Sequence, residues 1–294
     1  MPTFAEAEAA LKARGYTDAN VEEKLAQDIL LAAFARSGHR AQLAIKGGVV
    51  MAALSGDIRR TTLDLDVDFV RRSIDDDSIR ALVRDLDGGV EGVSVSLVGD
   101  IVELRQQDYR GKRVFLSLQD AAGDTIQAKL DIGVHALAGV EQVEMAFDVG
   151  TAAAGPAVLF ANSPEQVFVE KLRSLLRLGP ISNRGKDVFD MLYLAGRIDR
   201  ARTRTLVDRC ICQDPRMLET DLSGIVRRAS RTFSDRNYAA RLAHRRSNWL
   251  GIPPAEAAAR RGAAFPNSPP RRIQHSAFII HHCEKPPPPK GQCR

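Results

Sequence analysis

Three aspartates alternate with apolar residues in the segment DLDVDF at residues 64–69. This alternation is typical of a half-buried strand, on which residues two apart share a face at a spacing of roughly 7 Å. The carboxylates of Asp64, Asp66 and Asp68 are therefore expected to point the same way. Carboxylates this close repel one another unless a cation lies between them. Mg²⁺ suits the position, because it takes one or two carboxylates and completes its coordination with water and phosphate oxygens.

A glycine pair precedes the acidic segment. Gly47 and Gly48 follow Lys46 at the end of a short strand expected at 42–45, and an apolar run that suits a helix continues to residue 54. If the glycines begin that helix, their N–H groups can approach a phosphate closely at the positive end of the helix dipole. For Lys46, the alternatives are an ordinary strand-end lysine, a contact to phosphate, or a partner for the carboxylates.

Each of these motifs has an ordinary explanation when it is taken alone. An Asp-x-Asp pair on a strand is often a solvated face, and a Gly-Gly pair is usually a turn. Glycine turn, helix, loop and acidic strand nevertheless occur in this order within residues 46–69. One short stretch thus offers a phosphate cradle beside a carboxylate pair for metal ions, which can hold the attacking and leaving oxygens of a displacement at phosphorus. The sequence therefore predicts nucleotide chemistry.

The same residues resemble the first motif of the AbiEii/AbiGii toxin family of nucleotidyltransferases. That motif is usually KGG(T/S) followed by R-x-S-x-DLD. Here Lys46-Gly47-Gly48 is followed, across a slightly longer loop, by Arg60, Thr62 and Asp64-Leu65-Asp66. The resemblance implies the toxin of a type IV toxin–antitoxin or phage abortive-infection pair, neutralised by a cognate antitoxin protein.

A third carboxylate is expected on a later strand, at 125–134. Lys129 and Asp131 are two residues apart there, so they share one face of the strand. In polymerase-like nucleotidyltransferases, which this arrangement resembles, a third carboxylate joins the D-x-D pair and binds metal or accepts the proton of the incoming hydroxyl. The alternative is a surface aspartate in a salt bridge with Lys129.

Two further segments resemble the later motifs of the family, E-K-L and R-(G/K)-R-D-x-x-D. The first contains Glu170-Lys171, and the second runs from Arg184 through Lys186-Asp187 to Asp190. By this resemblance Lys171 faces the nucleotide phosphates, Asp187 completes the site, and Asp190 is the second carboxylate of the repeat. Lys186 stands where the family usually has arginine, which keeps the positive charge and loses the bidentate fork. Without the resemblance, Lys171 would be a partner for neighbouring residues on a helix surface.

Three overlapping sets of candidate residues follow. The expected ligands of Mg²⁺ (or Mn²⁺) are Asp64, Asp66 and Asp131. The catalytic set contains these three aspartates together with Lys171 and Asp187. The residues expected to bind the NTP are Lys46, Gly47, Gly48, Arg60, Thr62, Lys171, Arg184 and Asp190.

The elements that must position these residues are predicted from periodicity and capping signals. Helices are expected at 21–36, 75–86, 164–178 and 185–195, and strands at 93–104, 112–118 and 125–134. Ser163 is the expected N-cap of the helix at 164–178, with Pro164 as its first residue and Gln166 as its capping-box partner.

The predicted fold class is α/β (α+β), with a nucleotidyltransferase-like mixed β-sheet flanked by helices and followed by a helical C-terminal domain. The expected domains are a catalytic domain at 1–160, a helical domain at 161–250 that completes the active site, and a Pro/Arg-rich, disordered tail at 251–294.

Charge is divided unevenly along the chain. Residues 1–199 carry a net charge of −7 and residues 200–294 one of +12, within a total of +5. A basic C-terminal part suits an enzyme that acts on nucleic acid, and the alternative is a set of Arg-rich helices that are merely solvated. The sequence has no apolar run long enough for a membrane span, no secretory signal and no C-x-x-C motif, so a cytoplasmic location is expected.

These observations favour a metal-dependent nucleotidyltransferase that transfers NMP from an NTP to an acceptor hydroxyl. The 3′ end of tRNA is the acceptor that the family resemblance suggests, as a hypothesis. Two alternatives remain open. One is a nucleotidyltransferase that modifies a protein or a small molecule. The other is a binding protein without catalytic activity, in which the carboxylates are vestigial or structural.

Overall fold

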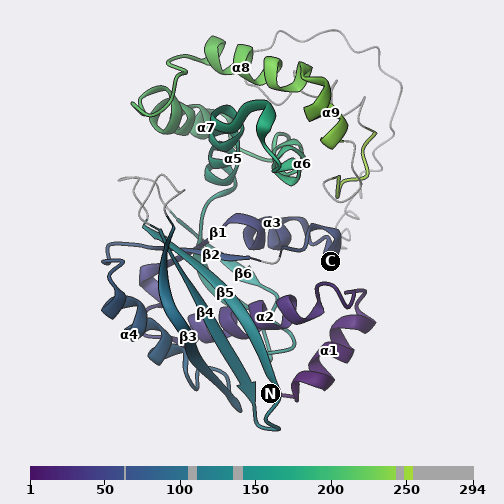
Figure 1. Cartoon of the computed structure of the whole chain (residues 1–294), viewed down its shortest axis with the longest axis vertical. Helices are drawn as coiled ribbons and strands as arrows, with labels where there is room; N and C mark the ends of the chain where they lie inside the picture. Colours follow the sequence, from purple (N-terminus) through teal and green to yellow (C-terminus); the bar gives the residue numbers. More distant parts are fainter. Residues whose placement is uncertain (63, 105–110, 135–141, 243–247, 254–294) are drawn as a thin grey trace, which may run out of the picture.

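Seven strands form one mixed sheet in the order β3-β4-β5-β2-β1-β7-β6 (Figure 1). The pairs β2–β5 and β1–β7 are parallel, and the other neighbours are antiparallel. The computed structural model describes residues 1–62, 64–104, 111–134, 142–242 and 248–253. The strands are β1 (Leu43–Lys46), β2 (Leu65–Phe69), β3 (Val93–Leu104), β4 (Gly111–Asp120), β5 (Thr125–Val134), β6 (Val143–Phe147) and β7 (Ala157–Ala161).

Helix α2 (Val21–Arg36) packs on the sheet and organises the core. It contacts β5 and β7, and it also contacts α1 (Phe4–Ala13) and α4 (Asp76–Leu86). Because the helix is covered from several sides, every residue from Leu25 to Phe34 is buried. This explains the apolar run at 29–35, which is wider than the stripe of a helix that packs on one side only.

In the described part of the chain, five α-helices follow β7, and they lie together beyond one end of the sheet (Figure 1). They are α5 (Pro164–Leu178), α6 (Gly185–Leu194), α7 (Arg200–Val207), α8 (Leu222–Ser234) and α9 (Arg236–Leu242). Helix α5 contacts α6, α7 and α8 and is therefore the centre of this group. A π-helical turn, Asp208–Cys212, continues α7.

The predicted fold class is confirmed, since helices flank a mixed sheet and a group of helices follows it. Among the capping predictions, Ser163 does accept a hydrogen bond from the N–H of Gln166. The predicted capping-box role of Gln166 is wrong, because its side-chain amide donates instead to Glu170 on the next turn, at 3.0 Å. The domain boundaries stay a prediction, and residues 254–294 of the expected tail lie outside the described residues. Within the part of the chain that is described, no helix is long and apolar enough to span a membrane.

A buried ion pair joins the sheet part to the helical part. Arg60 follows α3 (Gly47–Ser55), and its guanidinium donates two hydrogen bonds to Asp190 of α6, at 2.5 and 2.6 Å. Asp190 also accepts a hydrogen bond from the indole N–H of Trp249 at 2.9 Å. The side chains of Arg60 and Asp190 are only 4% and 0% exposed. Trp249 is buried, as expected of a core residue.

Replacing Arg60 by Leu is expected to lower the free energy of unfolding by about 3 kcal/mol, because it leaves a buried carboxylate with one cation fewer. Lys171 still contacts Asp190 in that variant, so the loss falls at the lower end for a broken buried pair. Urea unfolding of the full chain measures it. The neighbouring Arg59 is the matched control, since its side chain is 62% exposed, and Arg59→Leu should change stability by about 0.5 kcal/mol or less. Equal losses in the two variants would contradict a role for the buried pair.

Candidate active site

The predicted aspartates come together at one end of the sheet. Asp66 on β2 and Asp131 on β5 are direct partners in the parallel pairing of these strands, and Asp64 comes just before β2. All three line a cavity of about 1260 Å³, together with Asp68. Alternate residues of a strand share a face, so the three aspartates at 64, 66 and 68 were expected to point the same way. Their common position in the lining of this cavity agrees with that expectation.

Three of these four carboxylates are paired with a cation. Asp131 accepts two hydrogen bonds from the Arg113 guanidinium of β4, at 2.7 and 2.8 Å. Asp64 forms an ion pair with Lys129. The alternative salt bridge between Lys129 and Asp131 is therefore wrong. The parallel register sets Leu65 opposite Leu130, so Lys129 falls level with Asp64 instead.

Asp66 is the exception. Among the described residues, no side chain forms a hydrogen bond or an ion pair with its carboxylate. Burial raises the pKa of Asp66 to about 6. The charges of Asp131, Asp64 and Asp68 add to this rise, and the charge of Lys46 opposes it. A carboxylate in this position favours the arrival of a cation, because a cation would relieve both the desolvation and the repulsion.

The glycine pair begins α3, as predicted, and both glycines are needed for close approach. Gly47 has a φ of +69°, and an added Cβ atom would overlap Oδ2 of Asp66. A Cβ atom on Gly48 would lie 2.7 Å from Oγ1 of Thr62. The missing side chains therefore let the acidic strand and the residues before it pack directly against the start of α3.

Lys46 is a partner for the carboxylates, which was one of its three interpretations. Its ammonium lies 2.5 Å from Oδ1 of Asp68. Burial alone would lower the pKa of Lys46, but the charge and hydrogen bond of Asp68, with the charges of Glu170 and Asp66, together outweigh burial and raise the pKa. Gly133 on β5 makes room for this ion pair, since a Cβ atom there would overlap Oδ1 of Asp68 and lie 2.8 Å from Nζ of Lys46.

The later motifs supply the opposite wall of the cavity. Lys171 on α5 is buried, and its ammonium lies 2.6 Å from Asp187 and 2.9 Å from Asp190. Burial would lower the pKa of Lys171, but these two carboxylates outweigh it and raise the pKa. The interpretation of Lys171 as a partner on a helix surface is therefore wrong. Lys171, Asp187 and Arg184 line the cavity with the sheet carboxylates.

Four of the residues expected to bind the NTP do not line the cavity within the described part of the chain; they are Gly48, Arg60, Thr62 and Asp190. They lie behind it, where Arg60 and Asp190 form the buried pair. Lys186, which replaces the usual arginine of the motif, donates to the carbonyl of Thr61 at 3.0 Å. Burial, with the charge of Arg60, lowers the pKa of Lys186.

Several lining residues were not among the site residues predicted from the sequence. Gln166, Glu170, Arg173 and Arg177 of α5 all face the cavity, at spacings of four, three and four residues. Such a polar stripe on one side of an otherwise apolar helix could have indicated them. Arg113 gave no comparable signal, because its contact with Asp131 depends on the register of β4 on β5.

The carboxylate oxygens at this cavity suit a hard divalent cation that keeps part of its hydration shell. Among the residues described, no three Asp, Glu, His or Cys side chains gather closely enough to hold a metal ion alone. Mg²⁺ does not require such a cage, because one or two carboxylates with water and phosphate oxygens suffice. Asp66, with Asp64 or Asp131 beside it, meets this smaller requirement.

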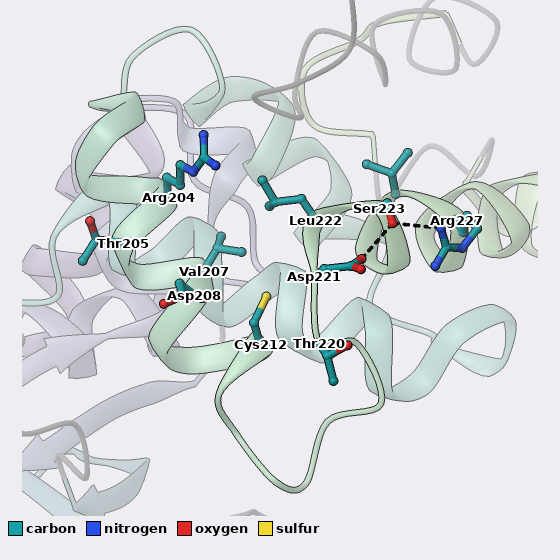
Figure 2. A pocket seen from close by; sticks show the side chains of 11 residues that line it. Arg204, Thr205, Val207, Asp208, Cys212, Thr220, Asp221, Leu222, Ser223 and Arg227 are labelled. Carbon is teal, nitrogen blue, oxygen red and sulfur yellow. Dashed lines mark hydrogen bonds between the residues drawn. The ribbon is translucent and has the colours of Figure 1, made fainter.

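A second cavity, of about 1100 Å³, lies between α7 and the start of α8 (Figure 2). Its lining includes Val207, Cys212 and Leu222, and none of the predicted site residues. Both acidic residues of this lining are engaged. Asp208 accepts a hydrogen bond from the side-chain amide of Gln213 at 2.5 Å. Asp221 caps α8, where it accepts hydrogen bonds from the N–H of Gly224 at 2.6 Å and from the hydroxyl of Ser223 at 2.8 Å. This cavity therefore offers less chemistry than the one at the sheet end.

Comparison with known proteins agrees with this geometry. The chain matches the model of the family described as nucleotidyl transferase AbiEii toxin, type IV toxin–antitoxin system, over residues 28–259. No curated protein matches the chain. The matched range contains every motif described above and most of the chain. The chain therefore belongs to the AbiEii family of nucleotidyl transferase toxins of type IV toxin–antitoxin systems.

Proposed function

We propose that the cavity at the sheet end is the active site of a metal-dependent nucleotidyltransferase that uses an NTP. The observation that carries the proposal is the meeting of two groups from distant parts of the sequence. The carboxylates of Asp64, Asp66 and Asp131 face the Lys171–Asp187 pair across the same cavity. A volume of about 1260 Å³ is ample for a nucleotide.

In this proposal Asp66, together with Asp64 or Asp131, would hold Mg²⁺ or Mn²⁺, and the cation would neutralise the charge of the phosphates. The phosphates lie between the start of α3 at Gly47 and the ammonium of Lys171, with Arg184 at the rim. Lys129 and Arg113 orient Asp64 and Asp131 from outside the carboxylate cluster.

The reaction is an in-line substitution at the α-phosphorus. The acceptor oxygen forms a bond to phosphorus while the bond to the pyrophosphate oxygen breaks, and the hydroxyl proton passes to a carboxylate, for which Asp131 is the candidate. Positioning and charge neutralisation carry most of such a reaction, so the protein needs no covalent intermediate.

The proposed acceptor is the 3′ end of tRNA, and the proposed setting is growth inhibition or phage defence in the cytoplasm, controlled by the cognate antitoxin. Two features support a nucleic acid. Residues 200–294 carry a net charge of +12, and Arg177, Arg209 and Arg216 stand at the cavity on the side of the helices. Arginines placed there can contact a phosphate backbone beside the site of transfer.

Incubation of the full chain with α-labelled NTPs, Mg²⁺ and total tRNA is expected to transfer label to the RNA. Asp66→Asn should lower this transfer by at least about 100-fold, because it removes a group that acts on charge in the transition state. The control Asp77→Asn changes an exposed aspartate of α4 and should transfer normally. Label found on protein or on a small molecule, and not on RNA, would contradict tRNA as the acceptor. Full transfer by Asp66→Asn would contradict the assignment of this cavity as the active site.

Gly47→Ala and Gly56→Ala form a matched pair. Both glycines have positive φ, +69° and +62°, so each substitution strains the backbone and should cost about 1 kcal/mol of stability. The new Cβ atom at Gly47 would overlap Asp66, whereas the new Cβ atom at Gly56 would have no other atom within 4 Å. We expect a loss of transfer in Gly47→Ala alone. Similar activity in the two variants would show that the approach of Gly47 to Asp66 does not matter.

A further inference from the structure

Glu170 is a carboxylate of the cavity that the proposed mechanism does not use. It lies on α5, one residue before Lys171, and it lines the same cavity as the sheet carboxylates. Its Oε1 atom accepts two hydrogen bonds of 3.0 Å, one from the side-chain amide of Asn162 and one from that of Gln166. Its second oxygen, Oε2, has neither a hydrogen bond nor an ion pair with any described residue. One oxygen is thus fixed by the protein and the other is available.

No protein cation is assigned to this carboxylate. The ammonium of Lys171 is shared by Asp187 and Asp190, and that of Lys46 is bound to Asp68. Burial raises the pKa of Glu170, and the negative charge of Asp68 raises it further. A poorly solvated acceptor with an unused oxygen gains from any hydrogen-bond donor that a ligand brings to it.

The charge of Glu170 limits which part of a ligand can supply that donor. A phosphate group is excluded, because it would bring a second anion to a carboxylate already close to Asp68. The phosphates belong with Gly47 and Lys171 in the proposed mode, so a nucleotide presents its sugar and base to the remaining wall. The donors on those parts are ribose hydroxyls and the N–H groups of a nucleobase.

We propose that Glu170 is a specificity-determining residue, whose Oε2 atom accepts a hydrogen bond from an O–H or N–H donor on the sugar or base of the incoming nucleotide. This inference rests on the proposed function, since it assumes that a nucleotide occupies the cavity. A site that is built to bind such a donor discriminates strongly against an analogue without it, because the buried acceptor is then left unpaired.

Glu170→Gln tests this directly, because the two amide donors predict how the new side chain would sit. Its carbonyl oxygen would stay with Asn162 and Gln166, and its NH₂ group would take the place of Oε2. The variant therefore turns the available acceptor into a donor with little change in shape. Glu165→Gln is the matched control on the same helix, since Glu165 is buried but accepts from the N–H of Asp199 outside the cavity.

The measurement is equilibrium binding by titration calorimetry, with the four NTPs and the 2′-deoxy and 3′-deoxy forms of the preferred one, in the presence of Mg²⁺. The wild type is expected to favour a nucleotide that carries the donor by about 10-fold or more over its analogue without it. Glu170→Gln should abolish that difference in affinity without weakening the binding of the analogue. Loss of the ratio among the four bases assigns the donor to the base, and loss of the deoxy ratio assigns it to the ribose.

Equal weakening of all nucleotides, or ratios that do not change, would overturn the proposal for Glu170. Should Glu170→Gln unfold, Glu170→Asp serves instead, because the shorter side chain keeps the charge and withdraws the free oxygen. The proposed function is judged separately by label transfer. Nucleotide binding with the expected ratios but without transfer would count against the function and leave Glu170 in place, whereas a wild type that binds no nucleotide would overturn both.

Discussion

The carboxylate of Asp190 holds the two parts of this structure in their relative positions. It is fully buried, and it is shared by Arg60 from the segment after α3, Lys171 from α5 and Trp249 from near the end of the described chain. Its burial favours the neutral acid, but Lys171 and Arg60 outweigh this and lower the pKa of Asp190. Because its partners come from segments far apart in the sequence, this one charged group fixes how α5 and α6 face the sheet.

The shape of the cavity in front of Asp190 depends on how α5 and α6 are held against the sheet. Lys171 contacts Asp190 with one side and Asp187 with the other, so the ammonium is held at the cavity wall. Across the cavity, the carboxylates on the sheet are balanced one by one, with Lys129, Arg113 and Lys46 as their partners. Asp66 alone lacks a partner among the described residues. A site in which the other sheet carboxylates are paired and Asp66 is not is suited to take up a cation together with an anionic ligand.

Much of this could be predicted from local sequence patterns. The alternation at residues 64–69 predicted β2, the glycine pair predicted the start of α3, and Ser163-Pro164 predicted the start of α5, because each of these signals acts over a few residues. The pairing of charges could not be predicted in the same way. Arg113 and Lys129 pair with Asp131 and Asp64 because of the register of β4, β5 and β2. Arg60 pairs with Asp190, which is 130 residues away in the sequence. Gln166 shows the same limit, since its side chain bonds to the half-buried carboxylate of Glu170 instead of following the general capping rule.

The most direct test is a crystal structure of the full chain with Mn²⁺ and a non-hydrolysable NTP analogue, in which anomalous scattering locates the metal. Mn²⁺ is expected at Asp66 with Asp64 or Asp131, and the triphosphate is expected between Gly47 and Lys171. A nucleotide bound elsewhere, for instance in the cavity between α7 and α8, with no metal at the sheet carboxylates, would contradict it.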